Sequence, residues 1–365
     1  MNATKQNVTL GRDWLLNMGK GAAEAVPPVS IQYCMAYPRH VMQTVEIPSV
    51  TQVRASCDYH PGNTDGCSFP YCQWNVGTSS LLAYSVGLAP SKDNFWTTAE
   101  QPGNKYGNKT REPYGEMGGM ITAYSTGPVA VGDGVGYTDS ELVLRSCTKT
   151  SGTLLQPSRP ATTIDACFFQ EAFGGSLGPV PVKRRNYPVW STHTAVSGRK
   201  WGHLVAILLA EPFKVTPAML PLDLDLDDGG GGAAAATYLQ WTGYGPVSNV
   251  TVHGAFSAAS PIALPKCNAS DFQLYHAAPI FNNKLALLGE PSKWVPVATK
   301  RIVAVDANGT SITVAVRGDP HESVSLAFAD ATDGGGVKVV QVDCTLSAKG
   351  AATATFDVSG VGLCC

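Results

Sequence analysis

The first 150 residues alternate short apolar runs with longer segments whose apolar positions recur at helical spacing. This pattern predicts helices at residues 10–25, 73–86, 114–125 and 140–147. It predicts strands at residues 29–36, 50–54, 87–90 and 128–132. Strands that alternate with helices in this way are typical of βα units and of a parallel sheet. Four such units are half of the eight that close a (β/α)8 barrel.

The pattern changes at about residue 162, after which short β-rich runs are separated by turn residues. These runs lie at residues 189–194, 203–209, 300–306, 311–316, 323–328, 337–342 and 352–358. Their spacing predicts an antiparallel β-sandwich. The expected organisation is therefore a partial barrel at residues 1–161 and a β-sandwich domain at residues 162–365. Within the second domain, residues 222–236 are low in complexity and predict an expanded surface loop.

Charge and hydropathy exclude two classes of partner. A formal net charge of −2 with 15% charged residues lacks the clustered basic excess of a nucleic-acid-binding protein. No apolar run approaches the roughly 20 residues that span a bilayer. We therefore expect neither nucleic acid nor a membrane as a partner. Residues 1–6 also lack the apolar core of a secretory signal peptide.

Cysteines and glycosylation sequons bear on the compartment. The chain has ten cysteines, which fit disulfides in an oxidising compartment. Asn-x-Ser/Thr sequons occur at Asn2, Asn7, Asn108, Asn249, Asn268 and Asn308. Together they favour the secretory pathway or an extracellular location, and a cytoplasmic protein with inert sequons is the alternative. Asn308 is the best glycan candidate, since Asn-Gly between two expected strands predicts an exposed hairpin tip.

The sequence Val-Arg-Ala-Ser-Cys-Asp-Tyr at residues 53–59 carries the most informative chemical signal. It puts Arg54 at the end of an expected strand and Asp58 in the loop that follows. A carboxylate at the C-terminal end of a strand, beside a guanidinium, is where a (β/α)8 barrel enzyme holds its catalytic groups. By itself, such a pair is often only a salt bridge within a loop.

This run resembles the acid/base signature of the raffinose synthase and alkaline α-galactosidase family, which is similar to glycoside hydrolase family 36 and belongs to the α-galactosidase clan. Further segments resemble the family in the same order at residues 34–36, 90–95, 126–133, 152–155 and 159–165. The similarity covers roughly residues 30–169. It implies strands five to eight of a (β/α)8 barrel followed by the family's β domain.

The resemblance also implies an activity: retaining hydrolysis or transglycosylation of α-galactosides, with an oligosaccharide as substrate and no cofactor. Asp58 would be the general acid/base, and Arg54 would hold a sugar hydroxyl. Asp93 and Asp133, at the ends of the next two strands, would accept hydrogen bonds from sugar hydroxyls, and bracing of a loop is the alternative for both. Tyr59 would offer an apolar face to the sugar, with core packing as its alternative.

Departures from the family pattern affect the substrate and the activity. Cys57 stands where the family has a second acidic residue, Lys92 replaces a tryptophan, and an insertion occupies about residues 103–113. The family's nucleophile lies on an earlier strand, and nothing before residue 29 resembles it. We therefore expect a fragment that is inactive alone. The competing interpretation is a non-catalytic carbohydrate-binding or scaffold protein built on a degenerate half-barrel.

Two groups of cysteines allow other readings. Cys57, His60, Cys67 and Cys72 could ligate zinc, but their spacing matches no common zinc motif. A Cys67–Cys72 disulfide or free thiols are preferred, and no metal is expected. The terminal pair Cys364-Cys365 resembles a doubly prenylated terminus only superficially. We expect a frayed or disulfide-linked tail instead.

Overall fold

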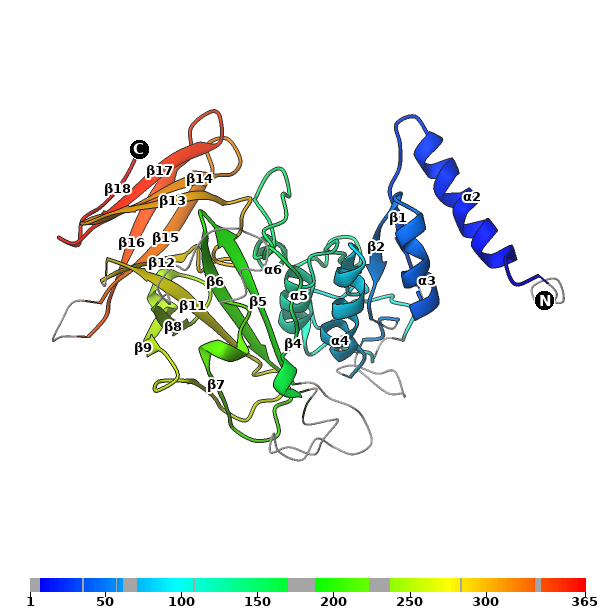
Figure 1. The fold of residues 1–365 in the computed structure, drawn as a ribbon, viewed down its shortest axis with the longest axis horizontal. Helices are drawn as coiled ribbons and strands as arrows, with labels where there is room; N and C mark the ends of the chain where they lie inside the picture. Colours follow the sequence, from blue (N-terminus) through cyan, green and yellow to red (C-terminus); the bar gives the residue numbers. More distant parts are fainter. Residues whose placement is uncertain are drawn as a thin grey trace.

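The computed structural model describes residues 7–34, 36–56, 58–61, 71–107, 109–167, 169, 188–222, 237–282, 284–331 and 336–365. Several sequence features fall outside this part, namely Asn2, Cys57, Cys67, Asn108, the side chain of Cys72 and nearly all of the predicted 222–236 loop. The fold is mixed α/β and mostly β, with parallel and antiparallel sheets. Figure 1 shows helix α2 (Leu10–Glu24) at one end of an elongated molecule and the antiparallel sheets at the other.

The N-terminal part holds a three-stranded parallel sheet. Its strands β1 (Ile31–Tyr33), β2 (Val50–Arg54) and β3 (Ala89–Ser91) are neighbours in chain order, and both pairings are parallel. Helix α3 (Pro38–Gln43), the 3-10 turn η1 (Thr44–Glu46) and helix α4 (Tyr71–Ser85) connect them. Val50 and Val53 of β2 are buried with Val41 of α3 and Ala83 of α4. The expected βα alternation is therefore present, although the sequence pattern missed α3.

The prediction of a strand at residues 128–132 is wrong. This segment forms one parallel bridge, between Val131 and Phe95, instead of a continued ladder. Pro128 has no N–H to donate to a neighbour, and the chain passes so close to β3 that a Cβ at Gly127 would lie 2.4 Å from the Pro90 carbonyl oxygen. The predicted helices on either side are present as α5 (Gly115–Tyr124) and α6 (Ser140–Leu144).

The C-terminal part consists of antiparallel sheets. The largest contains β4 (Thr162–Thr163), β5 (Val189–Val196), β6 (Arg199–Ala206), β8 (Tyr238–Thr242), β9 (Thr251–Phe256), β11 (Gln273–Phe281), β12 (Leu285–Gly289), β15 (Ser323–Asp330) and β16 (Lys338–Thr345). A second contains β13 (Ile302–Asn308), β14 (Ser311–Arg317), β17 (Ala351–Asp357) and β18 (Gly362–Cys364). A small one pairs β7 (Phe213–Val215) with β10 (Ile262–Leu264), and the 3-10 turns η2 (Pro217–Met219) and η3 (Val247–Asn249) lie between strands. Phe328 and Phe356 pack 5.1 Å apart in a core that the two larger sheets share.

A second hydrophobic core crosses the predicted boundary at residue 161. It contains Met120 and Tyr124 of α5 together with Trp190, Val205 and Trp294 of the β-rich part. The Tyr124 hydroxyl donates a hydrogen bond of 2.6 Å to the Trp294 carbonyl, 170 residues along the chain. The two parts therefore share buried apolar surface, which is the main source of stability in packed domains.

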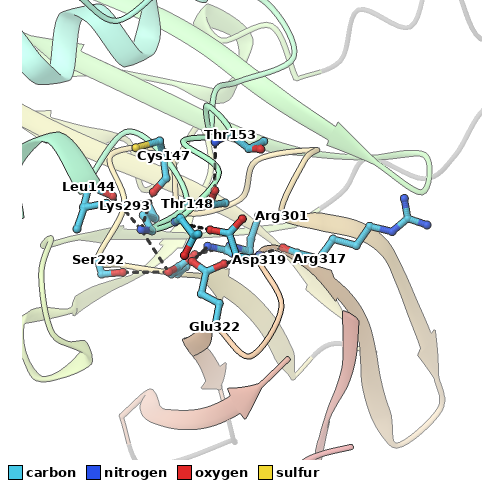
Figure 2. A network of polar contacts seen from close by, with 12 residues as sticks. Leu144, Cys147, Thr148, Thr153, Ser292, Lys293, Arg301, Arg317, Asp319 and Glu322 are labelled. Carbon is cyan, nitrogen blue, oxygen red and sulfur yellow. Dashed lines mark hydrogen bonds and ion pairs between the residues drawn. The ribbon is translucent and has the colours of Figure 1, made fainter. Parts of the chain in front are cut away.

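A polar network completes this junction (Figure 2). The Lys293 ammonium donates to the carbonyl of Leu144, which ends α6, at 2.8 Å and to that of Cys147, which follows α6, at 2.9 Å. The Asp319 carboxylate accepts from the backbone N–H of Thr150 at 2.6 Å and of Ser151 at 3.1 Å. These bonds attach the loop after α6 to the antiparallel part.

Beneath that loop, Arg301 is the centre of a buried charge cluster. Its guanidinium donates to Glu290 at 2.8 Å and to Glu322 at 2.6 and 2.9 Å. Because burial favours the neutral acid, the pKa of Glu290 is raised, whereas hydrogen bonds from Arg301 hold that of Glu322 down. Buried charges of this kind are tolerated only when they are paired.

The remaining observations concern the cysteines and the length of the helices. Cys364 forms a disulfide with Cys344, so the prediction of a disulfide-linked tail is confirmed. Cys34, Cys147, Cys167, Cys267 and Cys365 are free thiols. In the part of the chain that the structure describes, every helix is too short or too polar to cross a bilayer.

Candidate functional site

The ends of β2 and β3 form the candidate site. Because the two strands are parallel, their C-terminal ends lie at the same edge of the sheet. Arg54 ends β2, and its guanidinium donates to Asp58 at 2.5 Å and to Asp93, which follows β3, at 3.3 Å. The structure thus brings together three residues that the sequence analysis selected, two of them 39 positions apart.

These three side chains differ in exposure. The side chain of Arg54 is 9% exposed and that of Asp93 is 23% exposed, whereas that of Asp58 is 72% exposed. Asp93 also accepts hydrogen bonds from the backbone N–H of Tyr59 at 2.6 Å and of Asn94 at 2.8 Å. Asp93 is therefore held in place from several sides, and Asp58 is the carboxylate that faces solvent.

Tyr59 lies beneath this cluster, with 5% of its surface exposed. Its hydroxyl donates to the Glu112 carboxylate at 2.5 Å and accepts from the backbone N–H of Trp96 at 3.1 Å. Its carbonyl accepts from the Tyr106 hydroxyl at 3.0 Å. This burial fits the core-packing alternative for Tyr59 better than it fits a ring face that is open to a sugar.

Lys92 and Glu112 both contact Tyr59, Lys92 over the ring and Glu112 at the hydroxyl, and neither was assigned a role from the sequence. The Lys92 ammonium stands 5.0 Å from the Tyr59 ring centroid and donates to the carbonyls of Asp93 and Asn94. Desolvation lowers the pKa of Lys92 to about 7, while the negative charges of Glu112 and Asp93 oppose that shift. Desolvation raises the pKa of Glu112, and the hydrogen bond from Tyr59 and the charge of Lys92 counteract this rise.

A signal for this pair was present in the sequence. Lys92 and the segment at about residues 103–113, which contains Glu112, were both expected to depart from the family that the chain resembles. The two residues are neighbours in space, and Glu112, together with Asp93, supplies the negative charge that a buried lysine needs.

Asp133 is not part of the Arg54 cluster. Its carboxylate accepts from the backbone N–H of Thr97 at 2.8 Å, from the Thr97 hydroxyl at 2.6 Å and from the Gln101 amide at 2.9 Å. These contacts are those of the loop-bracing alternative. They connect the loop that follows Val131 to the segment that begins the insertion.

Two cavities adjoin the cluster. One of about 400 Å³ lies beside Arg54 and is lined by Tyr37, Val41, Ser56 and Leu82 among others. The second, of about 350 Å³, lies on the side of β3 and is lined by Asn94, Trp96, Gln101, Tyr106 and Asp133 among others. The candidate site is therefore an ion-paired cluster with one cavity at Arg54 and a second cavity at Tyr59 and Asn94, which follow Asp58 and Asp93 in the chain. Among the described residues, no group of three or more His, Cys, Asp or Glu side chains forms a metal site.

The sequons that the structure describes are on the surface. Asn308 lies at the tip of the β13–β14 hairpin, where it pairs with Ser311, and it is exposed as expected. Asn249 is exposed at the end of η3, directly before β9. Asn268 is exposed in the loop before β11.

Neither the family models nor the curated proteins matched this chain.

Proposed function

We propose that this chain carries the acid/base side of the active site of a retaining glycosidase or transglycosidase that acts on α-galactosides. The fold would be the second half of a (β/α)8 barrel, strands five to eight, followed by a β-sandwich. One observation carries the proposal: Arg54 holds Asp58 and Asp93 together at the C-terminal edge of a parallel sheet. That edge is where barrel enzymes keep their catalytic groups.

Asp58 would act as the general acid/base. It would protonate the leaving oxygen and then activate a water or an acceptor sugar. Its exposure leaves it free to meet a substrate, while the buried Arg54 fixes its position. A general acid works best when it is shielded from water, so a bound substrate or a further segment would have to cover Asp58.

Arg54 and Asp93 would bind the sugar. The planar fork of an arginine suits neighbouring oxygens. Asp93 Oδ2 accepts from Arg54 and the Tyr59 N–H, whereas Oδ1, among the described residues, accepts only from the Asn94 N–H and would take a further hydrogen bond from a sugar hydroxyl. Tyr59 would then position the acid/base loop instead of stacking on sugar.

A retaining mechanism needs a second carboxylate about 5 to 5.5 Å from the acid/base. Among the described strands, β1 is paired only with β2, so its other edge can receive a further parallel strand. We propose that the nucleophile lies on such a strand and that this chain by itself is inactive. The acid/base half would become competent only when that strand is supplied.

The test uses aryl α-galactosides with good and poor leaving groups. The purified chain should show no turnover above background. When a strand with the nucleophile completes the site, Asp58→Ala should impair poor leaving groups far more than good ones, because only the former need protonation. Azide should restore part of the deglycosylation rate. Equal losses for all leaving groups, without an azide response, would contradict the assignment of Asp58.

The alternative function is a carbohydrate-binding or scaffold protein without catalysis. The exposure of Asp58 and its pairing with Arg54 favour this reading, since an ion pair at a loop is stable without any reaction. Sugar binding together with no turnover in the completed protein would support it.

We also propose passage through the secretory pathway. The exposed sequons Asn249, Asn268 and Asn308 and the Cys344–Cys364 disulfide support this location. Endoglycosidase treatment of natively expressed protein should lower its apparent mass, and Asn308→Gln should remove part of that change. An unchanged mass with freely titrating thiols would indicate a cytoplasmic protein.

A further inference from the structure

The cavity of about 350 Å³ beside β3 is lined by the segment after β3, by the start of the expected insertion at about residues 103–113 and by residues 132–134. Its volume is at the lower end of the roughly 300–1,000 Å³ typical of small-molecule sites. Asn104, Tyr106, Gly132 and Asp133 are among the residues that line it. Trp96 and Tyr106, whose ring centroids are 6.1 Å apart, provide aromatic edges.

Among the polar groups that line this cavity, Asn94 gives the evidence for a ligand. Its side-chain carbonyl oxygen is buried and has no hydrogen-bond partner among the described residues. An unpaired buried carbonyl costs free energy, so natural structures keep such groups mainly where they serve a purpose. The other lining amides are satisfied, since Gln101 bonds to Thr98, Asp133 and Gly134.

The charge of the lining selects the class of ligand. The Asp133 carboxylate already accepts three hydrogen bonds, and the ammonium of Lys105 is positioned over the Tyr106 ring at 5.0 Å. The remaining carboxamide of Asn94 offers a donor and an acceptor, which match the hydroxyls of a neutral ligand. Aromatic edges next to such an amide suit the mixed polar and apolar surface of a sugar ring.

We propose that this cavity binds one neutral sugar unit, with Asn94 as its hydrogen-bonding residue. The inference rests on the proposed function, because the cavity adjoins Asp93 through Asn94 and would hold a unit next to the one at Asp58. The bound unit would be part of the oligosaccharide or the acceptor of a transfer.

Binding to the chain as it is tests the proposal without any need for turnover. Saturation-transfer NMR and calorimetry with methyl α-galactoside and with sucrose should detect binding of at least one probe. Asn94→Leu keeps the approximate volume and removes both hydrogen-bonding groups, so it should weaken binding by about tenfold or more. Gly132→Ala places a methyl group 3.1 Å from the Asn94 amide and should weaken binding by displacing it.

The controls separate this site from the catalytic proposal. Asn268→Leu changes an exposed asparagine far along the chain and should bind as the wild type does. Asp58→Asn should also leave probe binding in this cavity intact, whereas it would abolish turnover of the completed enzyme. If Asn94→Leu does not fold, the binding measured with Gly132→Ala tests the proposal. No binding of either probe by the wild type, or full binding by the folded variants, overturns the proposal.

Discussion

The hydroxyl of Tyr59 donates a hydrogen bond of 2.5 Å to the carboxylate of Glu112, which is 53 residues away in the chain. Both groups are buried, and Tyr59 directly follows the exposed Asp58. The insertion that carries Glu112 therefore supports the loop that holds the candidate acid/base. The geometry of that loop therefore depends on Glu112, which is not among the lining residues of either cavity.

Glu112→Gln should reduce stability, because it removes the negative charge that faces Lys92 and weakens the bond from Tyr59. We expect a loss of about 1–3 kcal/mol in the free energy of unfolding, measured with urea. Glu100→Gln is the matched control, since Glu100 forms an exposed ion pair with Arg111, the residue directly before Glu112. It should change stability by no more than about 0.5 kcal/mol. Equal effects of the two variants would contradict a supporting role for Glu112.

The buried pair His203 and His276 should make stability depend on pH. Their Nδ1 atoms are 2.9 Å apart, and burial lowers the pKa of His203 well below 6.5 and that of His276 to about 3. Above about pH 6.5 both residues are neutral in the folded and the unfolded chain. Below it, only the unfolded chain gains protons, so stability falls by up to about 1.4 kcal/mol per pH unit for each histidine.

Unfolding free energies measured between pH 4 and 7 should show this slope, and His276→Gln should flatten it. The exposed His321→Asn should leave the slope unchanged, and asparagine tolerates the positive φ of 61° at that position. A slope that is the same in His276→Gln as in the wild type would show that carboxylates, not this pair, control the acid response.

Arg301→Leu should be strongly destabilising, because it leaves Glu290 and Glu322 buried without their partner. Removal of one member of a buried ion pair typically costs about 3–5 kcal/mol. Arg317→Leu is the control, since its guanidinium points away from the network in Figure 2 and only its carbonyl accepts from Arg301. A thermal unfolding scan in which the two variants behave alike would show that the network contributes little.

The Cys344–Cys364 disulfide should stabilise the C-terminal sheets. It joins β16 to β18 across a sequence separation of 20 residues. Closing a loop of this length stabilises by roughly 3 kcal/mol. Cys364→Ser should therefore lower the midpoint of urea unfolding as much as reduction of the wild type does, while Cys365→Ser, a free thiol, should not. A reducing agent that leaves the wild-type midpoint unchanged would contradict this.

Local pattern was enough to determine several elements of this protein. The run at residues 50–54 predicted β2 because its apolar and β-branched residues are bounded by turn residues, and the helical spacing at residues 10–25 predicted α2. The four-residue spacing of Arg54 and Asp58 placed the two side chains within reach of each other, since both lie in one strand and its loop, and they form an ion pair. The alternating and antiparallel halves of the chain followed from the same periodicities.

Tertiary structure alone decided the rest. The contact of Arg54 with Asp93 depends on β2 and β3 being adjacent, and strand adjacency is not a local property of either segment. The burial of Lys92 beside Glu112 depends on how an insertion folds over β3. Residues 128–132 pair through a single bridge, from Val131 to Phe95, which local composition did not reveal. Local composition encodes which segment can be a helix or a strand, whereas the partner of a buried charge is set by packing between distant segments.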